Sequence, residues 1–256
     1  MITSNKSLAA KLALTLMAGA SLLAFAWPLL IVNPSQDAVA QTLLMALMPA
    51  LVIFGLVELS AGALDSKKLA TLAVLTAVNS LVRLLGAGMA GIETVFFLII
   101  IAGYVFRSAF GYLIGSLSLL VSALIGAGGG PWLPFQMMAA GLVGLGAGLL
   151  PRTRNKWSQI AILVVFAIVG AYFYGALMTL WNWPFLAGDH SSLSYVAGAG
   201  ILENLQTFLK FELFTGGLLW DTGRAATTCV LLALTAPALL PTLRRAANRA
   251  GFEKKL

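Results

Sequence analysis

The sequence predicts an all-α polytopic membrane protein with eight membrane-spanning helices and both ends of the chain in the cytoplasm. Hydrophobic residues make up 60% of the 256 residues and charged residues 10%, whereas about a quarter of the residues in soluble domains are charged. Apolar runs alternate with short basic turns along the chain. Lipid must therefore surround most of this protein, and each crossing must be a helix, because a helix satisfies its own backbone hydrogen bonds in lipid.

Eight apolar runs between charges and turn residues define the predicted crossings. In chain order they are 12–32, 38–59, 69–85, 92–106, 110–127, 135–150, 157–181 and 225–240. A crossing needs about 20 apolar residues. The shorter runs are therefore expected to extend beyond these limits, or to lie in thinned or protein-lined membrane.

The first run has an alternative interpretation as a cleaved signal peptide. Lys6 and Lys11 precede it, and Ala24, Phe25 and Ala26 mimic a cleavage site. The run is 21 residues long, which is enough to cross the bilayer and favours a retained helix.

The basic residues predict the orientation of the helices. With the N-terminus inside, thirteen of the sixteen basic residues face the cytoplasm, and only Arg83, Lys210 and Arg224 do not. The thirteen are Lys6, Lys11, Lys67, Lys68, Arg107, Arg152, Arg154, Lys156, Arg244, Arg245, Arg249, Lys254 and Lys255. Such a bias is typical of cytoplasmic loops. The formal charge of +7 thus indicates membrane topology, and no nucleic acid partner is expected.

The segment 193–214 is predicted to be an amphipathic helix on the outer surface. Glu203, Gln206 and Lys210 recur at three- and four-residue spacing, with apolar side chains on the opposite face, a pattern typical of helices that lie in the membrane interface. A ninth crossing here would also place the basic C-terminal segment outside.

No catalytic or metal-binding motif is found in the sequence. The single cysteine, Cys229, and the single histidine, His190, exclude disulfides and metal sites built from several such ligands. Walker A, HExxH and GxSxG motifs are absent. The glycine run Gly126 to Gly130 lacks the Lys and Ser/Thr of a phosphate loop, so we interpret it as a flexible outer loop or lid.

Small residues recur at four-residue spacing in three of the predicted helices. The stripes are Ala73 and Ala77, Gly111 and Gly115, and Ala140, Gly144 and Gly148. Such stripes allow helices to approach closely in lipid. Each serves either packing within one bundle or docking to another membrane subunit.

Polar and aromatic side chains gather toward the predicted outer face. Arg83 and Glu93 end two consecutive helices joined by GAGMAG, and either pair with each other or contact a ligand. Five of the six tryptophans lie on the same side, as an interfacial belt or as the lining of an outward-facing pocket. The predicted cavity residues are Asn79, Arg83, Glu93, Trp132, Gln136, Trp181, Asn182, Trp183 and Trp220.

Two stretches of the chain resemble the substrate-binding S components of energy-coupling factor (ECF) transporters, which import vitamins into prokaryotes. They are KKLATLAVLTAVNSLVRLLGAGMAGIETVFFLIIIAGYVF (67–106) and FGYLIGSLSLLVSALIGAGGGPWLPFQMMAAGLVGLGAGLLPR (110–152). The resemblance implies a six-helix core over 67–245, an N-terminal extension of two transmembrane helices (1–66) and a basic tail (246–256). It also implies that Ala73 and Ala77, one turn after Ala70, match the AxxxA motif that docks the transmembrane T component.

The resemblance further implies transport without chemistry on the ligand. The chain would capture a vitamin outside the cell, while two partner ATPases hydrolyse ATP and the chain itself binds no cofactor. Cobalamin is favoured by the GIETVFFL and GPWLPFQM stretches, with riboflavin and pantothenate as alternatives because aromatic linings suit any flat ring. The rival functions are a small membrane-embedded lipid-modifying enzyme and a structural subunit of an unrelated permease.

Overall fold

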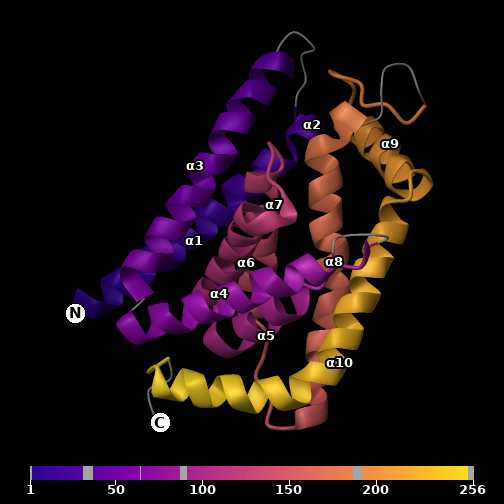
Figure 1. Ribbon diagram of the computed structural model, residues 1–256. Coiled ribbons are helices and arrows are strands. Elements are labelled where there is room, and N and C mark those ends of the chain that lie inside the picture. Colours follow the sequence, from indigo (N-terminus) through magenta and orange to yellow (C-terminus); the bar gives the residue numbers. More distant parts are fainter. Residues whose placement is uncertain (1, 31–36, 64, 87–90, 187–191, 253–256) are drawn as a thin grey trace.

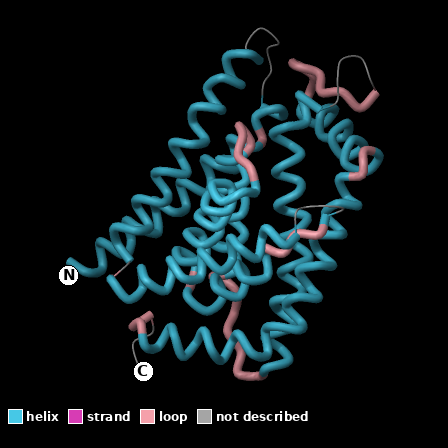
Figure 2. Tube along the Cα trace, in the orientation of Figure 1, coloured by secondary structure: helices cyan, strands magenta, loops and turns pink. Residues whose placement is uncertain are grey.

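The structure is a computed structural model that describes residues 2–30, 37–63, 65–86, 91–186 and 192–252. Within these ranges the chain forms helices and loops without a strand (Figure 2). The elements are α1 (Ile2–Phe25), α2 (Trp27–Leu30), α3 (Asp37–Ala63), α4 (Ser66–Gly86), α5 (Phe96–Phe106), α6 (Ser108–Ser122), the π-helical turn η3 (Ala123–Ala127), α7 (Leu133–Ala147), α8 (Lys156–Leu186), α9 (Ile201–Phe214) and α10 (Gly217–Arg249).

Every predicted crossing coincides with an apolar helical stretch. Four stretches are long and apolar enough to span a membrane: Ser66–Gly86, Ser108–Ala127, Lys156–Leu186 and Gly217–Arg249. Four shorter apolar stretches match the remaining predictions: Thr15–Phe25, Ala46–Val57, Phe96–Phe106 and Leu133–Ala147. The predicted all-α polytopic fold is confirmed.

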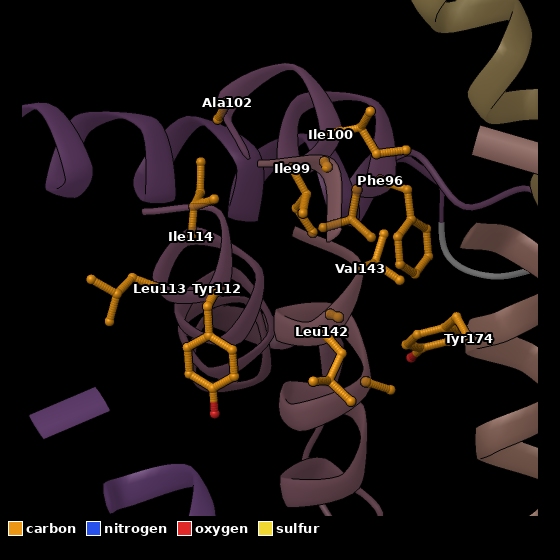
Figure 3. Packing of buried hydrophobic residues seen from close by; sticks show 14 of the residues in the cluster. Phe96, Ile99, Ile100, Ala102, Tyr112, Leu113, Ile114, Leu142, Val143 and Tyr174 are labelled. Carbon is orange, nitrogen blue, oxygen red and sulfur yellow. The ribbon is translucent and has the colours of Figure 1, made fainter. Parts of the chain in front are cut away.

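Helix α5 forms the centre of the bundle. All of its residues from Phe96 to Phe106 are buried, and Figure 3 shows Ile99 and Ile100 among side chains of α6 and α7. A helix that is apolar on every face is expected to be enclosed by other helices. Helix α5 has 11 residues and is too short to cross a bilayer alone. The helices around it shield it from lipid along its whole length.

Glycines allow α5, α6 and α7 to pack backbone against backbone. A Cβ atom at Gly111 would collide with the carbonyl of Gly144, and one at Gly115 with the carbonyl of Ala140. Gly103 on α5 approaches Gly144 in the same way. Packing within one bundle is therefore confirmed for the two predicted stripes on α6 and α7, as close helix approach in lipid requires.

The helices are arranged with the α1–α3 pair on one side and the α8–α10 pair on the other (Figure 1). Helix α4 crosses between them at a steep angle to α8, and α9 packs beside the ends of α2, α8 and α10. Helix α10 bends so that its last turns run across the base of the bundle. Pro237 and Pro241 lie inside it, and an internal proline removes a backbone hydrogen bond and kinks a helix.

The N-terminal helices pack directly on the region that follows them. The Trp27 indole donates to the carbonyl of Trp181 over 3.1 Å, and the rings of Phe25 and Phe135 meet edge to face at 5.7 Å. The extension therefore shares the main apolar core with α5 to α8.

Helix α9 is present where an amphipathic helix is predicted, although it begins at Ile201. Its buried side chains are Asn204, Phe208, Phe211 and Glu212. The buried face thus includes two polar groups, and it packs on α8, α2 and α10.

Candidate functional site

A cavity of about 660 Å³ lies where α4, α7, α8, α10 and the turn η3 meet. Polar, aromatic and apolar groups all contribute to its wall. The lining residues are Arg83, Leu84, Glu93, Val95, Gly126, Ala127, Gln136, Tyr174, Met178, Trp220 and Arg224. Four predicted site residues meet here: Arg83, Gln136 and Trp220 come from three different helices, and Glu93 comes from the segment before α5.

Arg224 is the electrostatic centre of the cavity wall. Its Nε and Nη2 donate to the two carboxylate oxygens of Glu93 over 2.9 and 3.2 Å, and its Nη1 contacts Asp221. The guanidinium also lies 4.8 Å from the centre of the Tyr174 ring, within the range of a cation–π contact. Asp221 fits against Gly175, where a side chain would occupy the space of the carboxylate. Two acids and two aromatic rings thus hold one buried arginine.

Tyr174 connects this cluster to the main core. Its ring meets Phe96 edge to face at 4.8 Å (Figure 3), and Phe96 opens the fully buried helix α5. The wall of the cavity is therefore supported by the most tightly enclosed part of the bundle.

Arg83 lines the same cavity but has a different environment. Its Nη1 donates to the hydroxyl of Ser122 over 2.9 Å, and it forms no ion pair with any acid that the structure describes. The sequence indicated Glu93 as a partner for Arg83, but both oxygens of Glu93 are engaged by Arg224. The lining therefore holds two guanidinium groups and one carboxylate, which leaves Arg83 available to an anionic group.

A second cavity of about 440 Å³ adjoins the first on the α9 side. The two share Met178, Trp220 and Arg224. Trp220 is 44% exposed and stands between them. The second cavity reaches Thr215 and Gly216, which join α9 to α10.

Asn79 lies one turn before Arg83, in the contact between α4 and α6. It is fully buried, and its Nδ2 donates to the Ser118 hydroxyl over 3.0 Å, while its Oδ1 has no partner in the described part of the chain. It does not line the cavity. A direct contact of Asn79 with substrate stays a prediction.

The other predicted aromatic residues occupy different places. Trp132 is 46% exposed at the start of α7, and Trp181 stacks on Phe135 with ring centres 3.9 Å apart. Trp183 is fully buried between Phe208 and Phe211 of α9, with Asn182 beside it in α8. None of these four lines the main cavity, so their contact with substrate stays a prediction.

The loop residues of interest are only partly described. Gly126 and Gly128 have positive φ angles, which glycine adopts without strain, and Gly126 lines the cavity. A lid function of this loop stays a prediction. His190, expected to be an exposed loop residue, lies outside the described residues.

Ala70, Ala73 and Ala77 lie on an exposed face of α4. Val74 and Leu81 beside them are 62% and 59% exposed. Unlike the glycine stripes of α6 and α7, this stripe is not covered by another described helix.

The fold and the cavity define a multi-pass helical membrane protein with a solute-sized chamber between its helices, lined by both apolar and charged groups. Residues 67–236 match the family model described as ECF transporter, substrate-specific component. The chain belongs to this family, as the sequence resemblance indicated. No curated protein and no solved structure matches the chain.

Membership of this family identifies the chain as the substrate-specific subunit of an ECF importer, and it is not an enzyme. The rival interpretation as a lipid-modifying enzyme is therefore excluded. The family works with a T component and ATPase partners. The matched region begins at Lys67, so helices α1 to α3 lie before it.

Proposed function

We propose that this chain captures a vitamin on the outer side of a prokaryotic cell membrane and delivers it inward when docked to a T component and two ATPases. The observation that carries the proposal is the 660 Å³ cavity with its ion-paired wall. Small-molecule sites are about 300–1,000 Å³ and combine apolar walls with a few fixed polar groups. The chain supplies the binding site, and ATP is used by the partners.

Cobalamin remains the favoured substrate because of the sequence stretches described above. A molecule of that size needs more room than the main cavity, and the adjoining 440 Å³ beyond Trp220 supports its fit. Riboflavin and pantothenate are the alternatives. Trp220 and Tyr174 suit a flat ring, while Arg83 suits a phosphate or carboxylate group.

The proposed orientation places both termini in the cytoplasm. The beginning of α1 and the end of α10 lie away from α9 in Figure 1. Of the thirteen basic residues predicted inside, eleven belong to described segments, and Lys254 and Lys255 lie outside the described residues. This bias supports the orientation. The cavity then lies toward the outer half of the membrane.

The proposed docking surface for the T component is the exposed stripe Ala70, Ala73 and Ala77. Small side chains let a second helix approach closely in lipid, and no described helix covers this face. Ala73→Leu with Ala77→Leu should fold normally but should not copurify with the T component. Copurification and uptake at wild-type levels would refute this assignment.

The binding proposal is tested with protein purified into nanodiscs and titrated with cobalamin, riboflavin and pantothenate. Wild-type protein should bind one of them, and Trp220→Ala should weaken that binding by about tenfold or more, as truncation of an aromatic anchor that the bound ligand covers does. Trp157→Ala is the matched control because Trp157 is 75% exposed at the opposite end of α8. The proposal fails if no vitamin binds, or if both variants bind as the wild type does.

A further inference from the structure

A cavity of about 420 Å³ lies at the other end of α8 from the substrate cavity. Gln159 of this cavity and Tyr174 of the substrate cavity are about 22 Å apart along the helix, at 1.5 Å per residue. The lining residues are Val105, Arg152, Thr153, Arg154, Gln159, Arg244, Ala247 and Asn248. Three guanidinium groups thus meet in this wall, and the described residues that line it include no acid.

Hydrogen bonds to neutral groups hold this wall in place. Arg244 donates to Oε1 of Gln159 over 3.0 Å, and Nε2 of Gln159 donates to the carbonyl of Thr153. Arg152 donates to the carbonyl of Val105 over 2.6 Å, at the end of α5, where backbone carbonyls lack helical partners. The guanidinium of Arg244 is therefore positioned by Gln159, a neutral group that does not cancel its charge.

Exposed apolar side chains lie within a few residues of Arg152 and Arg154 in the sequence, as expected at the level of the lipid headgroups. Trp157, in the first turn of α8, is 75% exposed, and Leu149, just after α7, is 71% exposed. Tryptophan is enriched at membrane–water interfaces. The apolar part of α8 begins at Ile160, three residues after Trp157, so the arginines of the cavity lie at the polar end of this helix.

We propose that this cavity binds the phosphate group of an anionic phospholipid, with Arg154 and Arg244 as its principal contacts. The planar guanidinium group matches phosphate geometry, and basic pockets between helices on the cytoplasmic side bind acidic headgroups. The bound headgroup links the α7–α8 connection to the last turns of α10. The site is separate from the substrate cavity and does not depend on which vitamin is carried.

The test measures the binding of phosphatidylglycerol and phosphatidylcholine to the delipidated full chain by native mass spectrometry. The site variant is Arg154→Gln with Arg244→Gln. The matched control is Lys156→Gln with Arg245→Gln, which removes two exposed charges within two residues of the site arginines in sequence without changing a residue of the cavity lining. Wild type and control should each retain one phosphatidylglycerol, and the site variant should bind it about tenfold more weakly than the control.

A second arm distinguishes a lipid phosphate from a free one. Inorganic phosphate should compete only weakly with phosphatidylglycerol, because it lacks the acyl chains that lie beside Trp157 and Leu149. If inorganic phosphate binds with the same arginine dependence and the lipid does not, the lipid assignment is overturned. Equal losses of phosphatidylglycerol binding in the site variant and the control would also overturn the proposal, because the binding would then depend on general surface charge and not on this cavity.

Folding is checked independently. Both double variants should keep the unfolding temperature of the wild type to within a few degrees. The single variant Arg154→Gln changes only an exposed side chain and should weaken phosphatidylglycerol binding in the same direction. Undiminished lipid binding in the single and double site variants would refute the proposal.

Discussion

Replacement of Arg224 with methionine should destabilise the protein more than most single substitutions. The change keeps an unbranched side chain of similar length but removes the cation that holds Glu93 and Asp221. In the wild type the side chains of Arg224 and Asp221 are 5% and 6% exposed, and that of Glu93 is 22% exposed. The variant therefore leaves one acid fully buried and one at the cavity wall, without their common partner.

The expected loss is about 3–5 kcal/mol, the usual cost of removing one partner from a buried ion pair. An independent limit gives a similar value for Asp221. A stranded carboxylate can be protonated instead, and at about pH 7 this costs about 4 kcal/mol for an acid with an ordinary pKa of about 3.9. Glu93 borders the cavity and contributes less, because water reaches it there.

Unfolding in mixed micelles measures this free energy directly. Arg224→Met combined with Glu93→Gln and Asp221→Asn removes all three charges, and it should recover at least half of the loss because no unpaired charge remains. The reasoning is refuted if Arg224→Met lies within about 1 kcal/mol of the wild type, or if the triple variant is no more stable than the single one.

Three further predictions concern other parts of the molecule. Gly111→Leu should prevent normal folding, because the leucine side chain would overlap the Gly144 carbonyl. Ala73→Leu, on the exposed face of α4, should fold normally. Equal yields of folded protein for the two variants would contradict the packing described. Glu212 lies on α9, outside the predicted spans, and burial raises the pKa of its carboxyl group. The folded state therefore binds the carboxyl proton more tightly than the unfolded chain does. As the pH rises and this proton is lost, the ionised Glu212 lowers the stability of the folded state. Glu212→Gln should therefore raise the unfolding temperature at about pH 8 and leave it unchanged at about pH 4, and a pH-independent difference would count against this interpretation. Arg83→Gln should weaken binding of an anionic vitamin by about tenfold or more, since a hydrogen bond to a charged group is worth about 1.5–3 kcal/mol; unchanged affinity, in protein with wild-type stability, would show that Arg83 does not contact the ligand.

The helices were predictable because lipid imposes a local constraint on the sequence. Each crossing must be apolar over many consecutive residues, so the eight runs mark the eight helical stretches. The last helix was the main difference, since it begins at Gly217 and not at Ala225. The charges of Asp221 and Arg224 caused this difference, because the prediction ends an apolar run at charged residues, and the pairing of Arg224 with Glu93 comes from 131 residues away.

The cavity was predictable only in part. Arg83, Glu93, Gln136 and Trp220 are predicted to share a depth in the membrane, and the structure shows that all four line one cavity. The spacing of Asp221 and Arg224, three residues apart on an apolar helix, was the signal that could have added them to the site. Trp183 is predicted at the same depth but packs on α9, because depth alone does not specify which neighbour a side chain contacts.

The small molecules that copurify with the protein test the central claim most directly. Mass spectrometry of the ligand released from wild-type protein should identify one vitamin in near-stoichiometric amount. The double variant Arg83→Gln with Trp220→Ala should release little or none of it. Release of no vitamin from the wild type under conditions where cells contain it, or equal release from both proteins, would contradict the assignment of this cavity as the substrate site.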